Sequence, residues 1–145
     1  MKPTLVTLFF LFIVSVTLAL ADDDFRGTRL SRFNGKDYSF DLYVNFLAKA
    51  PAWKEGDDFP PLPPLKARDI ALNKARELCP EVKAWGIERI SLQEIDQVTS
   101  NLPHCWIYLI DCESHDGPYS GPPRILEIPV LMNGSIPEPK IKSAK

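Results

Sequence analysis

The stretch LKARDIALNKARELC, residues Leu65 to Cys79, decides the predicted fold. Ala67, Ala71 and Ala75 recur at helical spacing, so they share one face of a helix. The proline run that ends at position 64 and the proline at position 80 mark where this helix begins and ends. Because alanine side chains are small, the helix backbone can come close to a sheet. We therefore expect a helix that lies across a sheet.

Three strand-like runs follow the helix: Trp85 to Ile95, His104 to Glu113 and Arg124 to Met132. The second run is apolar on both faces, which is typical of a central strand. Pro129 interrupts the third run and predicts an edge or bulged strand. Connections of a few residues favour antiparallel neighbours. These patterns predict an α+β fold, with one main helix packed on an antiparallel sheet of three to five strands.

Residues before the helix predict further β-structure. Tyr38 to Phe46 alternates apolar and polar residues, as a half-buried strand does, although a helical spacing also fits part of it. Asn34-Gly35 predicts a tight turn, and Leu30 to Phe33 before it predicts a short strand. Asn133-Gly134 predicts a second turn with a short returning strand at positions 135–136. Together with Ser135 it also matches the glycosylation acceptor pattern, for which a simple turn is the alternative.

The order of a helix and three strands, closed by VLMNGSIP, resembles the PepSY-like family of small exported domains. The residues that carry the resemblance are Ala67–Ala71, Ile87–Leu92, Trp106–Tyr108 and Val130–Ile136. The resemblance covers about residues 65–139. It implies a cystatin-like fold, a non-enzymatic regulatory or inhibitory role toward exported proteins, and no cofactor. Residues 97–101, QVTSN, lack the glycine of the cystatin Gln-x-Val-x-Gly hairpin, so we do not infer inhibition of cysteine proteases.

The amino terminus is typical of an export signal. An uncharged apolar run extends from Leu5 to Ala21, ends in Ala-Leu-Ala and is followed by three aspartates. This pattern predicts a signal peptide over residues 1–21 that is cleaved after Ala21, with an uncleaved membrane anchor as the alternative. We expect a polar segment at 22–37, a single domain at 38–139 that contains a proline-rich linker at 51–64, and a flexible tail at 140–145. The predicted location is secreted or periplasmic.

Charge and length restrict the partners. Cleavage removes Lys2 and leaves 16 basic and 19 acidic residues, a formal net charge of −3, in a chain of 124 residues. The charges are interspersed and form no basic patch, so we expect neither a nucleic-acid partner nor, after cleavage, a membrane. The proline-rich linker is either a docking ligand for an aromatic groove or a stiff connection across the domain surface.

The three cysteines and two histidines are the reactive candidates. In an oxidising compartment we predict a disulfide from Cys79 to Cys112, with Cys105 as the other partner within reach and three buried thiols as the main alternative. His104 and His115 lie near Cys105 and Cys112 in sequence, which suggests zinc, but strand geometry directs positions seven apart to opposite faces. A Cys105–His104 nucleophilic pair is disfavoured because adjacent side chains on a strand diverge. We therefore predict no metal, no cofactor and no catalytic residue.

Aromatic residues are the remaining candidates for contact with a partner. Trp53 lies in the linker, and Tyr119 lies in a Gly/Pro loop at residues 114–124. We expect both to contact another exported protein. The predicted function is a non-catalytic binding or regulatory module, with a small-ligand pocket between helix and sheet, or a hydrolase, as alternatives.

Overall fold

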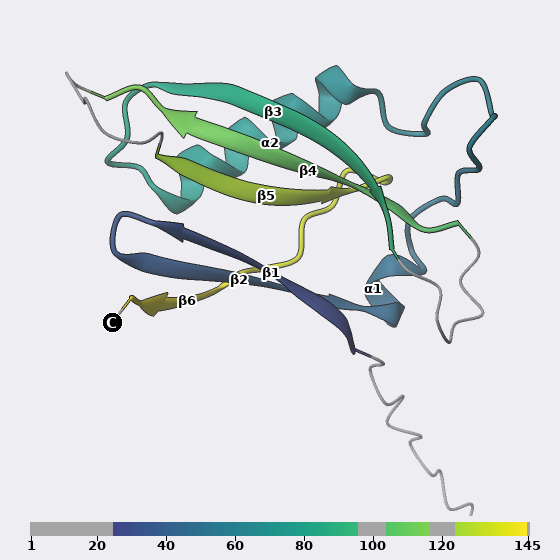
Figure 1. Ribbon diagram of the computed structural model, residues 1–145, viewed down its shortest axis with the longest axis horizontal. Coiled ribbons are helices and arrows are strands. Elements are labelled where there is room, and N and C mark those ends of the chain that lie inside the picture. The colour runs from purple at the N-terminus through teal and green to yellow at the C-terminus, as the bar shows by residue number, and fades with distance from the viewer. Residues whose placement is uncertain (1–24, 96–103, 117–123, 145) are drawn as a thin grey trace, which may run out of the picture.

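The computed structural model describes residues 25–95, 104–116 and 124–144, and these residues form mostly β-structure (Figure 1). Strands account for 45% of them and helices for 18%. The elements in chain order are β1 (Phe25–Phe33), β2 (Lys36–Tyr43), α1 (Val44–Leu47), α2 (Pro64–Leu78), β3 (Trp85–Glu94), β4 (Trp106–Ser114), β5 (Ile125–Leu131) and β6 (Lys140–Ser143).

The strands form two antiparallel sheets of three strands each, in the orders β1-β2-β6 and β3-β4-β5. The prediction of an α+β, cystatin-like fold with one antiparallel sheet is therefore wrong. The error lies at the two ends of the described chain, where polar residues form regular strands. The pattern of β1 is mostly polar and that of β6 is exposed throughout, so neither shows the alternation by which a strand is found in sequence.

The first sheet is built on a hairpin. Asn34 and Gly35 both adopt positive φ, 49° and 69°, which is the conformation of a two-residue hairpin turn and confirms the predicted turn. Polar pairs on its outer face join the strands, because Arg32 donates to Asp37 at 2.6 Å and Lys140 donates to Asp41 at 2.6 Å. The predicted flexible tail thus contributes strand β6, which pairs with β2.

The second sheet confirms the predicted order of its strands. β4 is central, and β5, which carries Pro129, is an outer strand. The predicted helix is also present and contacts all three strands of this sheet (Figure 1). Ala67, Ala71 and Ala75 are fully buried against the apolar side chains of β4 and β5. Small side chains allow this close approach, as the sequence pattern indicated.

A second core joins the two sheets at the end where α1 lies. Leu42, Leu47, Ile107 and Leu131 are almost fully buried in it. The strand predicted over residues 38–46 ends at Tyr43, and the next four residues turn into helix α1. This turn places Leu47 on the core rather than continuing the alternation of the strand.

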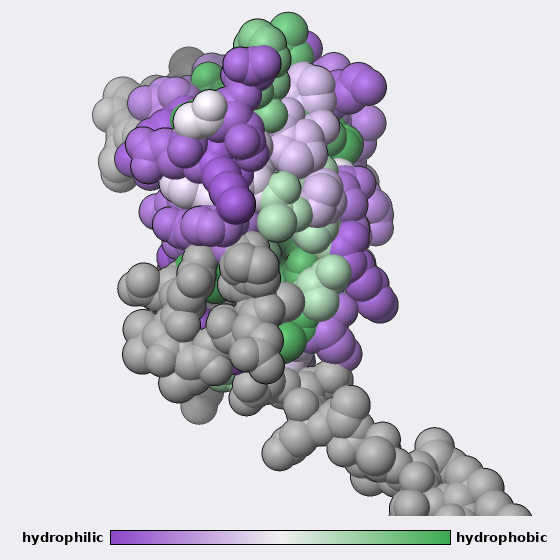
Figure 2. Space-filling view, turned by 90° about the vertical axis from the view of Figure 1, so that its right-hand side faces the viewer, coloured by the Kyte–Doolittle hydropathy of each residue, from purple (hydrophilic) through white to green (hydrophobic). Residues whose placement is uncertain are grey.

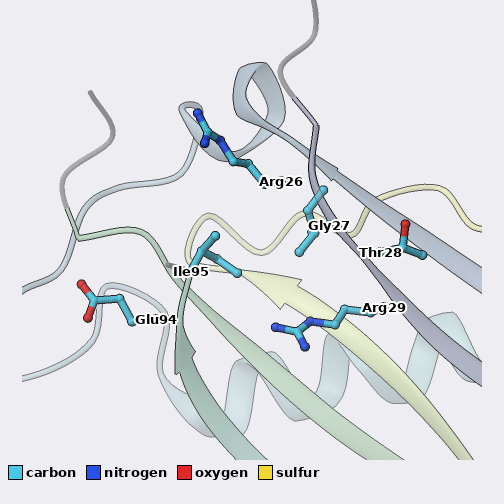
Figure 3. Close-up of a pocket in the computed structure, with 7 residues that line it drawn as sticks. Arg26, Gly27, Thr28, Arg29, Glu94 and Ile95 are labelled. Carbon is cyan, nitrogen blue, oxygen red and sulfur yellow. The ribbon is translucent and has the colours of Figure 1, made fainter. Parts of the chain in front are cut away.

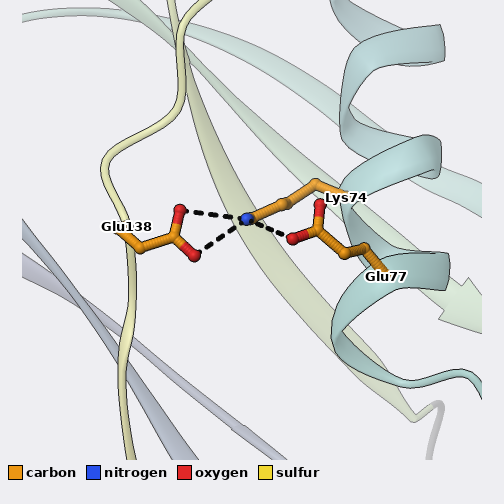
Figure 4. A network of polar contacts seen from close by, with 3 residues as sticks. All are labelled: Lys74, Glu77 and Glu138. Carbon is orange, nitrogen blue, oxygen red and sulfur yellow. Dashed lines mark hydrogen bonds and ion pairs between the residues drawn. The ribbon is translucent and has the colours of Figure 1, made fainter.

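The chain after β5 is tied to the rest of the molecule by polar contacts. Ser135 accepts a hydrogen bond from the N–H of Leu131 at 2.9 Å, but residues 135–136 form no strand. Lys74 on α2 then bonds Glu77 at 3.0 Å and Glu138 at 3.1 Å, which joins the final segment to the helix (Figure 4). The predicted signal peptide lies outside the described residues. Within the described ranges, neither α1 nor α2 has the length and hydropathy that a membrane span requires.

Candidate functional site

The three cysteines lie in the hydrophobic cores as free thiols. Burial raises the pKa of all three, and that of Cys112 to about 12, so they stay protonated and are poor nucleophiles at neutral pH. The hydroxyl of Tyr38 lies 3.2 Å from the sulfur of Cys79. Cys79 and Cys112 belong to the same core cluster without a bond between them, and their pairing stays a prediction.

The two histidines lie beyond opposite ends of the region that β4 spans. Nδ1 of His104 is 3.5 Å from Glu94, and Nε2 of His115 is 3.9 Å from Glu113. The structure therefore does not bring these imidazoles together. It pairs each with a carboxylate on the surface instead.

Trp53 packs against Trp106 at the start of β4. The ring centroids are 5.1 Å apart in an edge-to-face arrangement, and the backbone N–H of Trp53 donates to the carbonyl of His104 at 3.2 Å. Trp53 is half-buried, so it holds the linker against the sheet as well as facing solvent. Tyr119, the other predicted contact residue, lies outside the described residues.

The proline-rich segment after Trp53 forms an exposed apolar ridge, the Phe59–Leu65 ridge. Phe59 is 84% exposed and Leu65 is 64% exposed. Between them Leu62 is buried, and its carbonyl accepts a hydrogen bond from the buried hydroxyl of Tyr108 at 2.9 Å. Figure 2 views the side that carries α1 and the segment leading to α2, and shows hydrophobic residues in a narrow band between hydrophilic flanks. The ridge is therefore apolar, exposed and anchored in the core.

A charged cluster lies on the face of the second sheet away from α2. Asp111 is almost fully buried and forms an ion pair with Arg89 at 2.8 Å. Glu127 is the cross-strand neighbour of Asp111, and its N–H donates to the hydroxyl of Ser31 on β1 at 2.9 Å. The pKa of Glu127 is raised, mainly by its burial and secondly by the negative charge of Asp111.

The sequence did not predict this cluster because its members come from four strands. Strand register, which no local pattern shows, places Asp111 beside Arg89 and Glu127. An apolar run interrupted by an acidic residue in both β4 and β5 was the available signal. It indicates a paired polar position only once the register is known.

A pocket of about 270 Å³ lies where β1 passes the end of β3. We name it the seam pocket; its lining residues are Arg26, Gly27, Thr28, Arg29, Leu42, Glu94 and Ile95 (Figure 3). Buried side chains fill the space between α2 and its sheet, which was the predicted alternative site for a small ligand. The seam pocket is therefore a better place for a small molecule.

Comparison of the chain with protein-family models, with curated proteins and with solved structures finds no match.

Proposed function

We propose that the protein is an exported, non-catalytic module that binds another exported protein through the Phe59–Leu65 ridge. The observation that carries this proposal is the exposure of two large apolar side chains on an anchored segment. Single exposed apolar residues are common on soluble domains. Phe59 and Leu65, however, are joined by four prolines and a buried leucine, which restrict the backbone between them.

Rigidity matters because binding orders the residues that it engages. A segment already held by prolines and by the bond from Tyr108 to Leu62 loses less conformational entropy than a flexible loop. The non-catalytic part of the proposal is supported by the protonated, buried thiols and by the separation of the histidines. A regulatory role toward exported proteins is also what the resemblance to PepSY-like domains implies.

Site-specific photo-crosslinking tests this proposal. A photoreactive phenylalanine analogue replaces Phe59 in one preparation and Leu30 in another, and each is irradiated in the secreted fraction of the producing cells. Leu30 is the matched control because it is 72% exposed and lies on β1. We expect one protein to be captured from position 59 and not from position 30.

The affinity of the captured protein then measures the contribution of the ridge. Phe59→Ser and Leu65→Ser together are expected to raise its Kd by about tenfold or more, whereas Leu30→Ser changes it by less than about threefold. Equal capture from both positions, or no capture from position 59, would contradict the proposal.

A further inference from the structure

The seam pocket has a mostly polar lining, in which the guanidinium of Arg29 lies beside the aliphatic side chain of Ile95. We propose that it binds a small aliphatic carboxylate, the class to which the carboxyl-terminal residue of a peptide belongs. In this proposal Arg29 holds the carboxylate, and Ile95 contacts the aliphatic group. The site is separate from the Phe59–Leu65 ridge and does not depend on the function proposed for it.

Arg29 has the chemistry that such a ligand requires. Its Nη2 donates to the neutral amide oxygen of Gln93 at 2.9 Å, and no described carboxylate lies within 4.0 Å of its guanidinium. The positive charge of Arg29 acts to lower the pKa of Glu127, but the two side chains form no ion pair within 4.0 Å. A guanidinium carries five N–H donors in a planar fork that matches a carboxylate. Donors therefore remain for an added anion.

The backbone of β1 opens space in front of this arginine. The register of β1 against β2 shifts between Phe25 and Gly27, so β1 bulges at the pocket. Gly27 has no side chain, and a Cβ built there would meet nothing within 4 Å. Figure 3 shows Ile95 facing Gly27 across this space, with Arg29 beside it.

Glu94, the one acidic residue among the described residues of the lining, does not face the proposed ligand. Figure 3 shows the carboxylate of Glu94 turned away from Arg29, and it lies 3.5 Å from Nδ1 of His104. The volume of about 270 Å³ is near the lower end of small-molecule sites, which begin at roughly 300 Å³. A ligand the size of one amino-acid residue fits these limits, and its side chain would cover Ile95, which an inorganic anion leaves bare.

The probe is N-acetyl-leucine, titrated into the isotope-labelled protein and followed by amide chemical shifts. We expect saturable shifts at residues 27–29 and 95. N-acetyl-leucinamide, which lacks the charge, and acetate, which lacks the aliphatic group, should each bind about tenfold more weakly or worse. Inorganic phosphate should be similarly weak.

Two arginines on the same strand provide matched variants. Arg29→Gln is expected to weaken N-acetyl-leucine binding by about tenfold, whereas Arg32→Gln leaves it within about twofold, because Arg32 bonds Asp37 on the outer face. Ile95→Ser should also weaken binding, which keeps the test decisive if Arg29→Gln does not fold. Phe59→Ser should leave binding unchanged, so failure of the ridge and failure of the pocket are distinguishable.

The proposal is overturned if N-acetyl-leucine causes no saturable shift at these residues. It is also overturned if the amide or phosphate binds as tightly as the acid, or if Arg29→Gln and Arg32→Gln weaken binding equally.

Discussion

The hydrogen bond from Tyr108 to Leu62 connects the hydrophobic core to the exposed ridge, and Tyr108→Phe removes it alone. The two residues are buried, and the hydroxyl donates to the Leu62 carbonyl at 2.9 Å. Removing the donor leaves a buried carbonyl without this partner. We therefore expect the free energy of unfolding to fall by about 1–2 kcal/mol. For a chain of this size that corresponds to a decrease in Tm of roughly 3–6 °C.

Tyr38→Phe is the matched control, because Tyr38 is equally buried but its hydroxyl faces the sulfur of Cys79 at 3.2 Å. A thiol is a weak hydrogen-bonding partner, so this variant should lose about 0.5 kcal/mol or less. Urea unfolding followed by far-UV circular dichroism measures both values, and an unchanged slope keeps them comparable.

The same variant also tests how the ridge is held. The amides of Lys66 and Ala67 donate to the carbonyl of Pro63 at the end of the ridge. In native-state hydrogen exchange, these two amides should exchange faster in Tyr108→Phe and remain unchanged in Tyr38→Phe. Binding of the partner captured at Phe59 should weaken in parallel. If Tyr38→Phe lowers the stability more than Tyr108→Phe does, or if Tyr108→Phe leaves exchange in the ridge unaltered, the bond does not anchor the ridge.

Three further predictions concern the cores and turns. Glu127 has a folded-state pKa above its unfolded value, so its contribution to stability is complete at low pH and is lost as the pH rises through the folded pKa. Glu127→Gln should accordingly raise the urea midpoint at pH 7 to 8, with a difference that vanishes toward pH 4; an equal effect at both pH values would contradict this. Gly134→Ala should lower the free energy of unfolding by about 1–2 kcal/mol, because φ is 84° and the new Cβ would meet Ile70 at 3.1 Å. Gly35→Ala, with φ of 69° and open space, should lower it less, and calorimetry compares them. Alkylation of the unreduced, unfolded protein should add three groups by intact mass, whereas one added group would show that two cysteines form a disulfide, which peptide mapping would then assign.

Local pattern was sufficient for the elements whose residues are apolar at a clear period. The helix predicted over residues 65–79 spans Pro64–Leu78, and the three runs after it became β3, β4 and β5. Flanking prolines and the repeated alanines determine that helix without help from distant residues. The turn at Asn34 and Gly35 is likewise a property of its own two residues, since both tolerate positive φ.

The candidate sites were less predictable because they depend on neighbours distant in sequence. Trp53 was predicted to contact a partner, whereas its packing on Trp106 depends on where the linker crosses β4. The ridge was recognised only as a proline-rich linker, since nothing local shows that Leu62 is buried and Phe59 is not. Arg29 received no prediction at all. Its position beside Ile95 requires β1 to pass the end of β3.

Local sequence patterns account for β3, β4 and β5, for the helix that covers them and for the hairpin turn, because hydrophobic periodicity and turn residues act over a few positions. The assembly of β1, β2 and β6 into the separate first sheet depends on the tertiary fold, because polar strands are specified by the backbone partners that they meet. The tertiary fold also places Arg29 at the seam pocket and Asp111 beside Glu127. Strand register brings these charges together, and register depends on pairing across the whole fold.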